Sequence, residues 1–247
     1  VLDKKGETPL HKAAVNEKGA KTCEFLVSRG SNVNHQSSAG DTALHMALRE
    51  QIEDNVTMLC EGGADTRLPN GRGESPARMV CQIGNAQLLA LVLQYGADAT
   101  AIDDDGRSAL AVAILEQNMD CLNLLIQHGA AVMEDYADGS TPMHLCAQTG
   151  WAEAVPVLMN SVAMGSFMLQ KTNNRGDTAI ATGLRSGRDG ALQALLDAGS
   201  ELPSLPVHLA AAAQHSHAIR WVLGVDGVDP NEVDKHGGNA LHIAAHV

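Results

Sequence analysis

The sequence predicts an all-α solenoid of helix-turn-helix units joined by β-turn fingers, because one short pattern returns at a nearly constant spacing. The pattern is Thr8-Pro9-Leu10-His11, and its copies begin at Thr42, Ser75, Ser108, Thr141, Thr178 and Asn239. The first six starts are separated by 34, 33, 33, 33 and 37 residues, and a Gly stands two residues before every start. A period of this size is typical of stacked supersecondary units, which tilts the expected function towards binding.

The residues of one period justify each element in order. Thr or Ser at the first position can cap a helix, and a Pro next to it, as in Thr8-Pro9, suits the first helical turn. Small pairs such as Ala13-Ala14 let neighbouring first helices approach closely. A second, apolar helix then ends at a Gly such as Gly129, where a left-handed conformation terminates it. Turn-forming residues such as Asp103 open the next finger.

This pattern, together with closing segments such as Leu91 to Gly96, resembles the ankyrin-repeat family over nearly the whole chain. The resemblance implies paired antiparallel helices, joined by β-turn fingers and stacked into a curved rod. It predicts one ankyrin-repeat domain over residues 1–247. The expected repeats are 3–36, 37–69, 70–102, 103–135, 136–172, 173–199, a degenerate copy at 200–233 and a truncated copy at 234–247.

The seventh repeat departs from the pattern. Its segment from Pro206 to Ala211 keeps His208 and the small residues, but it has lost the Gly-x-Thr opening. Coupling between neighbours sets the cooperativity of a solenoid, so we expect the stack to open first near residues 200–230. Because the chain starts at Val1 and stops inside a repeat, we also expect it to be a piece of a longer protein.

Composition argues against several classes of function. A net charge of −12 disfavours nucleic-acid binding, which needs clustered Lys and Arg, and instead fits a basic protein partner. No apolar run approaches the length of a membrane span, so we expect no direct membrane insertion. An odd number of cysteines, five, without a C-x-x-C spacing favours a reducing, cytoplasmic location and structural thiols in the core.

The histidines predict structure rather than chemistry. Five of them share one position in the repeat: His11, His45, His144, His208 and His242. The family resemblance implies that this His hydrogen-bonds to the backbone of the turn between repeats. Positions one repeat apart are too distant to share an ion, so we expect no metal site. The sequence also has no nucleophile elbow, phosphate loop or dinucleotide fingerprint, so we expect no catalytic residues and no cofactor.

Partner binding is the function that the resemblance implies, on the concave side through the finger tips and the ends of the first helices. The candidate contact residues at these positions are Arg49, Arg72, Glu74, Asp104, Asp105, Arg107, Glu116, Tyr136 and Asp138. The alternative is that these positions are merely solvated and that only a few of them contact any one partner.

One cluster of these residues lies in the fingers of the fourth and fifth repeats. It surrounds Tyr136 with acidic residues: Asp103, Asp104, Asp105, Glu134, Asp135 and Asp138. Because Tyr is frequent among interface hot spots, the cluster is a candidate seat for a basic peptide segment containing Lys or Arg. The rival explanation is that Asp is simply a good turn residue.

A second cluster comes from the insertion that lengthens one period to 37 residues. The sequence predicts a loop over 161–169 in which Met164 and Phe167, beside Met168 and Leu169, offer an apolar contact site. The alternative is that Phe167 folds back over the end of a lengthened helix.

Asn34 matches the hairpin Asn that some ankyrin repeats offer to an asparaginyl hydroxylase; the alternative is a turn-stabilising side chain. As a whole, the sequence predicts a non-catalytic scaffold or adaptor that binds partner proteins through a preformed concave face. The alternative function is a regulatory or targeting domain of a larger enzyme, membrane-trafficking protein or channel whose activity lies outside this sequence.

Overall fold

The computed structural model describes residues 2–104, 106–161 and 165–246. Its chain divides into two compact units, Val1–Ala131 (unit 1) and Val132–Val247 (unit 2). The described residues are helical, with turns between the helices and one isolated antiparallel bridge, Ile102 to Ser108, in place of any sheet. The predicted all-α class is therefore confirmed.

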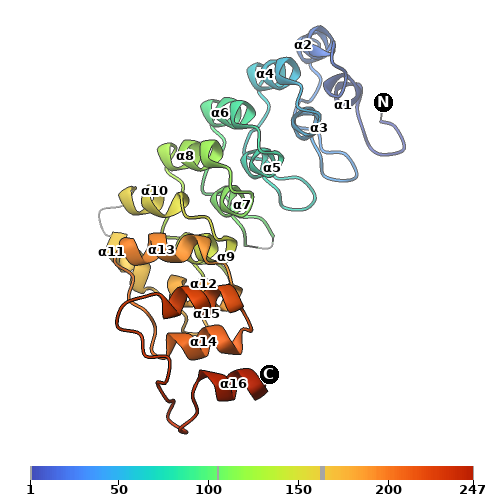
Figure 1. The fold of residues 1–247 in the computed structure, drawn as a ribbon. Helices are drawn as coiled ribbons and strands as arrows, with labels where there is room; N and C mark the ends of the chain where they lie inside the picture. Colours follow the sequence, from blue (N-terminus) through green and yellow to red (C-terminus); the bar gives the residue numbers. More distant parts are fainter. Residues whose placement is uncertain (1, 105, 162–164, 247) are drawn as a thin grey trace. The chain divides into compact units, whose positions relative to one another are not determined.

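Unit 1 holds four helix pairs. Their first helices form one row and their second helices form another, with loops projecting beyond the first row (Figure 1). The pairs are α1 (Pro9–Ala14) with α2 (Ala20–Ser28), α3 (Ala43–Arg49) with α4 (Glu53–Glu61), α5 (Pro76–Ile83) with α6 (Ala86–Gln94), and α7 (Ala109–Leu115) with α8 (Met119–Gln127).

Unit 2 continues the same design with one addition. Its helices are α9 (Pro142–Thr149), α10 (Ala154–Asn160), α11 (Gly165–Gln170), α12 (Ala179–Ser186), α13 (Gly190–Asp197), α14 (Pro206–Ala212), α15 (Ser216–Leu223) and α16 (Ala240–His246). The first helices α9, α12, α14 and α16 pack in that order, one against the next.

The helices begin and end where the sequence predicts. The hydroxyls of Ser75 and Ser108 accept hydrogen bonds from the amides three residues later, which caps α5 and α7. Beyond the second helices, glycines such as Gly30 and Gly129 take φ values of 81° and 83°, in the left-handed region that terminates a helix.

The core of each unit is a stripe of apolar side chains between the two helix rows. Leu44, Leu89 and Leu110 are fully buried in unit 1, and Met143 and Leu158 are fully buried in unit 2. All five cysteines are buried free thiols, and burial raises the pKa of both Cys60 and Cys146 to about 12. This agrees with their predicted structural role.

The insertion in the fifth repeat differs from the prediction. Where a loop is expected, α11 follows α10 and packs against it. Met168 and Leu169 are almost fully buried, because a short amphipathic helix places them against the core, while Phe167 on the same helix stays 50% exposed. Phe167 is therefore a helical residue that neither projects from a loop nor folds fully back, and Met164 lies outside the described residues.

Among the described residues, no helix has both the length and the apolar character that crossing a membrane requires.

Candidate functional site

Seven fingers share one backbone design. In each, the amide of the first residue donates to the carbonyl of the fifth, and the Gly amide donates to the carbonyl of the first. In the fourth finger, for example, Asp103 N lies 2.9 Å from Arg107 O, and Gly106 N lies 2.9 Å from Asp103 O. Asp104, at the tip of this closed turn, takes no part in either bond, and its side chain is exposed.

Neighbouring fingers are also bonded to one another. In unit 1, Ser38 N donates to Lys5 O at 2.9 Å, and Gly71 N donates to Ala39 O at 3.2 Å. In unit 2, Asn174 N donates to Asp138 O at 2.9 Å. These bonds join the first three fingers of unit 1 and the fifth and sixth fingers in unit 2 into bonded edges, and we call the surface formed by the fingers and the first helices the finger groove.

Three of the repeated histidines, His11, His144 and His208, join one repeat to the next, as the family resemblance implies. His11 Nε2 lies 3.0 Å from Asp41 O, and His144 Nε2 lies 2.9 Å from Asp177 O. The Thr8 amide, 3.1 Å from Nδ1, donates to the other ring nitrogen of His11. Burial lowers the pKa of both His45 and His144, which keeps the rings neutral.

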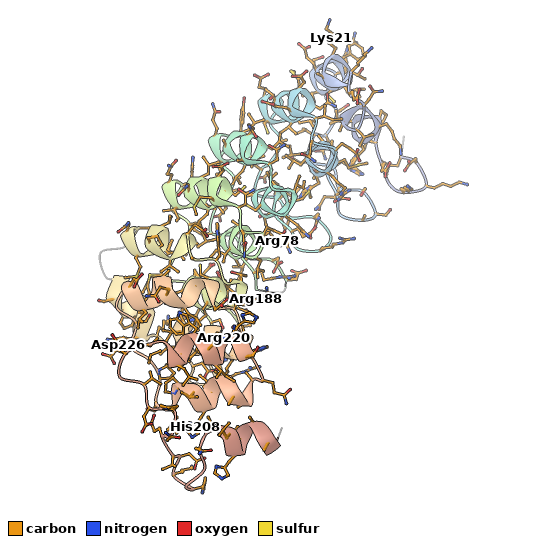
Figure 2. All side chains as sticks on the ribbon, viewed as in Figure 1. Lys21, Arg78, Arg188, His208, Arg220 and Asp226 are labelled. Carbon is orange, nitrogen blue, oxygen red and sulfur yellow. The ribbon has the colours of Figure 1, made fainter. Side chains whose placement is uncertain are left out.

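The third repeat replaces this histidine with Arg78, labelled in Figure 2. Arg78 Nε lies 2.7 Å from Asp103 Oδ2 in the next finger, and Arg78 Nη1 donates to Glu74 Oε1 at 2.9 Å. The side chains of Arg78 and Asp103 are only 6% and 2% exposed. A buried ion pair thus links the third repeat to the fourth finger, in place of the hydrogen bond that histidine makes in other repeats. Because Asp103 is buried in this pair, it is not part of the predicted acidic surface.

The other candidate residues of unit 1 differ in how much they are already engaged. Arg49 Nη2 contacts both carboxylate oxygens of Asp41, at 3.0 and 3.1 Å, and Glu74 is held by Arg78. The candidates whose side chains lie exposed at finger tips or at the end of α7 are Arg72, Asp104, Arg107 and Glu116. Asp105 lies outside the described residues.

In unit 2, the acidic side chains around Tyr136 have partners of their own. The hydroxyl of half-buried Tyr136 donates to Glu134 Oε1 at 2.6 Å, and Lys171 forms an ion pair with Asp135. Exposed Asp138 accepts bonds from both the amide and the hydroxyl of Ser140. The two halves of the predicted acidic cluster belong to different units, so each is described only within its own unit.

Asn34 bridges two repeats within unit 1. Its Oδ1 accepts from Asp65 N at 2.8 Å, and its Nδ2 donates to Gly63 O at 3.4 Å. The turn-stabilising role that the sequence left open is therefore present in the structure.

Each unit has a hollow lined by charged side chains; that of unit 1 lies at the joint between first and second helices. The acidic cleft of unit 1 has a volume of about 440 Å³ and is lined by Val15, Glu17, Glu50, Gln51, Ile52, Glu53 and Asp54. The Arg175 pocket of unit 2 has a volume of about 190 Å³ and is lined by Asp138, Ser140, Gln148, Asn173, Arg175, Asp177, Thr182, Arg185 and Ser186.

The sequence analysis did not predict the acidic cleft. Glu17 lies in the segment that joins α1 to α2 and Glu53 is the first residue of α4, whereas the candidate contact residues came from the finger tips and the ends of the first helices. The available signal was the recurrence of acids at this joint in two successive repeats. No group of three or more His, Cys, Asp or Glu in the described part of the chain is placed to hold a metal ion.

Comparison with known proteins agrees with this architecture. A family model described as "Ankyrin repeats (3 copies)" matches residues 1–70 and 63–135, more than half of the chain. "Ankyrin repeat and SOCS box protein 11" of Danio rerio is 38% identical over 95 residues, covering 38% of this chain and 31% of that protein. "Nuclear factor NF-kappa-B p105 subunit" of Gallus gallus is 31% identical over 157 residues, covering 62% of this chain and 16% of that protein.

A third relative, "Tyrosine-protein kinase HTK16" of Hydra vulgaris, is 34% identical over 94 residues, covering 37% of this chain and 12% of that protein. The chain thus spans less than a third of the length of each of these relatives. The fingers, the paired helices, the linking histidines and the matching family model lead to one conclusion: the chain belongs to the ankyrin-repeat family.

Proposed function

We propose that this chain is a non-catalytic scaffold or adaptor that binds partner proteins along its finger groove. Ankyrin repeats are protein-interaction modules, which supports a protein-binding role in general. The bonded finger edge supports the specific groove, because a surface that is already ordered loses little conformational entropy when a partner binds.

The observation that carries the choice of partner is the acidic cleft of unit 1. Four carboxylates line it, from Glu17, Glu50, Glu53 and Asp54, and none has an ion-pair or side-chain hydrogen-bond partner within the described residues. Val15, 36% exposed, adds an apolar surface to the cleft. We infer that the cleft takes a basic segment of a partner, with Lys or Arg next to an apolar side chain.

Part of this charge has a structural use. Glu53 and Asp54 lie in the first turn of α4, where acidic side chains favour the positive end of the helix. Glu17 and Glu50 lie outside that turn, so the helix does not account for the whole cluster. Exposed ion pairs contribute about 0.2–1 kcal/mol each, so binding through this cleft is modest and weakens as salt is added.

The test is capture of partner proteins from cell lysate by the wild-type chain, followed by measurement of each captured protein's affinity. Glu50→Lys combined with Glu17→Lys is expected to weaken capture of basic partners, most clearly at low salt. Glu24→Lys combined with Glu61→Lys is the matched control, because both residues are exposed on the second helices, α2 and α4. Equal capture by all three proteins would reject the cleft as the binding site.

The Tyr136 region is tested in the same assay with Tyr136→Ala combined with Asp138→Lys. If this variant loses a partner that the cleft variants keep, that partner binds in unit 2. The buried free thiols support a reducing, cytoplasmic setting for the binding.

A second candidate function is a regulatory or targeting domain within a larger enzyme or channel. Similar repeats occur within the Hydra kinase and within "Transient receptor potential cation channel subfamily A member 1" of Homo sapiens, which is 30% identical over 97 residues. The sequence of the parent transcript decides between the two functions, because only the second requires a catalytic or membrane-spanning segment on the same polypeptide.

A further inference from the structure

The Arg175 pocket is built from two successive repeats of unit 2. The fifth finger supplies Asp138 and the sixth finger supplies Arg175, while Gln148 comes from α9 and Arg185 from α12. At about 190 Å³ the pocket is smaller than the roughly 300–1,000 Å³ that is typical of small-molecule sites. It is suited to one side chain of a larger partner.

The hydrogen-bond acceptors of the pocket are largely occupied from within. Asp138 Oδ1 and Oδ2 accept from the amide and hydroxyl of Ser140, both at 2.9 Å. Asp177 Oδ2 lies 2.8 Å from Arg185 Nε. Asn173 Oδ1 accepts from the amides of Arg175 and Asp177, at 2.9 and 3.1 Å. Few acceptors in the pocket therefore remain for a ligand whose polar groups are hydrogen-bond donors.

The side-chain N–H donors of the pocket, in contrast, are largely without partners. Within the described residues, the guanidinium of Arg175 makes no ion pair or hydrogen bond, and the amide of Gln148 makes none either. Arg185 contacts Asp177 through Nε, and its side chain is 44% exposed. Two guanidinium groups and one amide thus present unused N–H groups in one hollow.

We propose that this pocket binds the carboxylate of an Asp or Glu side chain presented by a protein partner. A guanidinium fork matches the two oxygens of a carboxylate, and such charge-assisted bonds are stronger than neutral ones. A single negative charge is favoured over a doubly charged phosphate, because Asp138 and Asp177 also line the pocket and repel added negative charge.

The inference rests on the proposed function and narrows it. The basic segment that fits the acidic cleft of unit 1 and the acidic side chain that fits the Arg175 pocket are separate demands on a partner. Because the whole chain carries a net charge of −12, long-range attraction does not recruit an acidic residue. Recognition here depends on short-range hydrogen bonds. It therefore adds binding specificity and does not raise the association rate.

The experiment selects random peptides displayed on phage against the 247-residue chain, without phosphorylation of the peptides. Selected peptides are synthesised with a fluorescent label, and their Kd values are measured by anisotropy. The protein variants are Arg175→Gln and, as the matched control, Arg188→Gln, which removes an exposed arginine of the same unit outside the pocket (Figure 2). Thermal unfolding is expected to be unchanged by Arg175→Gln, because that side chain has no internal partner among the described residues.

We expect one class of peptides to lose about tenfold in affinity on Arg175→Gln and to be unaffected by Arg188→Gln. Each peptide of this class contains an Asp or Glu whose change to Asn or Gln gives the same loss. The two losses are not additive when combined, which places the two groups in contact.

Three results would overturn the inference. The first is a class of peptides that depends on Arg175 but contains no acidic residue that matters. The second is that every selected peptide loses affinity on Glu50→Lys and none loses affinity on Arg175→Gln. This result would leave the proposed function standing. The third is the absence of any binding peptide, which removes the proposed function as well.

Discussion

Arg78 and Asp103 form a buried ion pair across two successive repeats, with Arg78 Nε 2.7 Å from Asp103 Oδ2. The pair ties α5 to the base of the fourth finger, at the repeat position where His11 and His144 bond to a backbone carbonyl. Arg107 also approaches Asp103, at 3.5 Å, but its side chain is 44% exposed. Arg78 is therefore the buried counter-charge of Asp103.

Removing Arg78 is expected to destabilise the chain strongly. Arg78→Ala leaves the Asp103 carboxylate buried without its buried counter-charge, and breaking a buried pair in this way costs about 3–5 kcal/mol. Combining it with Asp103→Asn, which keeps the acceptor for Arg107 N, costs less than the sum of the two single changes. Urea unfolding measures all three variants, and losses that add to within about 0.5 kcal/mol would show that the pair is not coupled.

Stability is expected to fall in mild acid because of the buried histidines. Burial holds the pKa of His45 below its ordinary value of 6.5, so the unfolded chain binds a proton at a higher pH than the folded chain does. The stability contributed by the neutral ring is thus complete above pH 6.5 and is lost as pH falls through the lower folded value. Each such histidine contributes a slope of at most about 1.4 kcal/mol per pH unit.

Urea unfolding at several pH values between neutral and mildly acidic conditions checks this dependence. His45→Gln is expected to flatten the pH profile, while His236→Gln, at an exposed finger position, leaves it unchanged. An identical profile for His45→Gln and wild type would contradict the assignment.

The finger edge predicts different costs for two glycine substitutions. Gly30 and Gly40 both have positive φ, 81° and 76°, so alanine is strained at either position by about 1–2 kcal/mol. A Cβ at Gly30 meets open space, whereas one at Gly40 overlaps the backbone of Gly71 in the next finger. Gly40→Ala is therefore expected to lower the free energy of unfolding more than Gly30→Ala, and equal losses would argue against tight contact between the fingers.

The seventh repeat is expected to open before its neighbours in unit 2. Leu205 stands where other repeats have the capping Thr or Ser; it has a φ of 57° and gives α14 no side-chain cap. Hydrogen exchange should therefore be faster in α14 and α15 than in α12, which also lacks a side-chain cap but begins after an ordinary extended residue, because a strained residue at a helix start is a weak point. Leu205→Asn, which tolerates the left-handed conformation better, should slow this exchange. Uniformly slow exchange over residues 200–230 would contradict both expectations.

Asn34 stays a proposed hydroxylation position with a defined structural role. Asn34→Ala removes the bonds to Asp65 N and Gly63 O and is expected to cost about 1 kcal/mol of stability. Intact mass of the protein purified from its native cells tests the modification directly. One added oxygen that disappears in the variant supports it, and an unmodified mass rejects it.

The repeat frame was predictable from the sequence because its causes are local. The capping Ser108, the terminal Gly129 and the linking His144 each act within a few residues or at a fixed distance of one repeat, so periodicity exposes them. The same reasoning failed at the insertion. A loop was expected there because the insertion lengthens the period to 37 residues and displaces the closing Gly of the fifth repeat, but burial of Met168 and Leu169 stabilises α11 instead.

The candidate sites were less predictable, since they depend on which side chains remain unengaged after folding. Asp103 and Asp104 are neighbours of the same type in sequence, yet the first is buried against Arg78 and the second is exposed. Similarly, Arg175 and Arg185 share one pocket, but only Arg185 finds an acidic partner inside the unit. The sequence gives the charge of each residue, but it does not show which charges form ion pairs or hydrogen bonds within the fold.

The hydrogen bonds that close and join the fingers run between backbone atoms, as in Gly71 N to Ala39 O. At a tip position such as Arg72, the identity of the side chain therefore has little influence on whether the edge forms, whereas a side chain at Gly71 would overlap Ala39 O. Mutations at positions such as Arg72 can accumulate under selection for a new partner without a matching loss of foldability. In evolution and in protein engineering alike, this separation makes the fingers a set of exchangeable recognition positions on a constant scaffold.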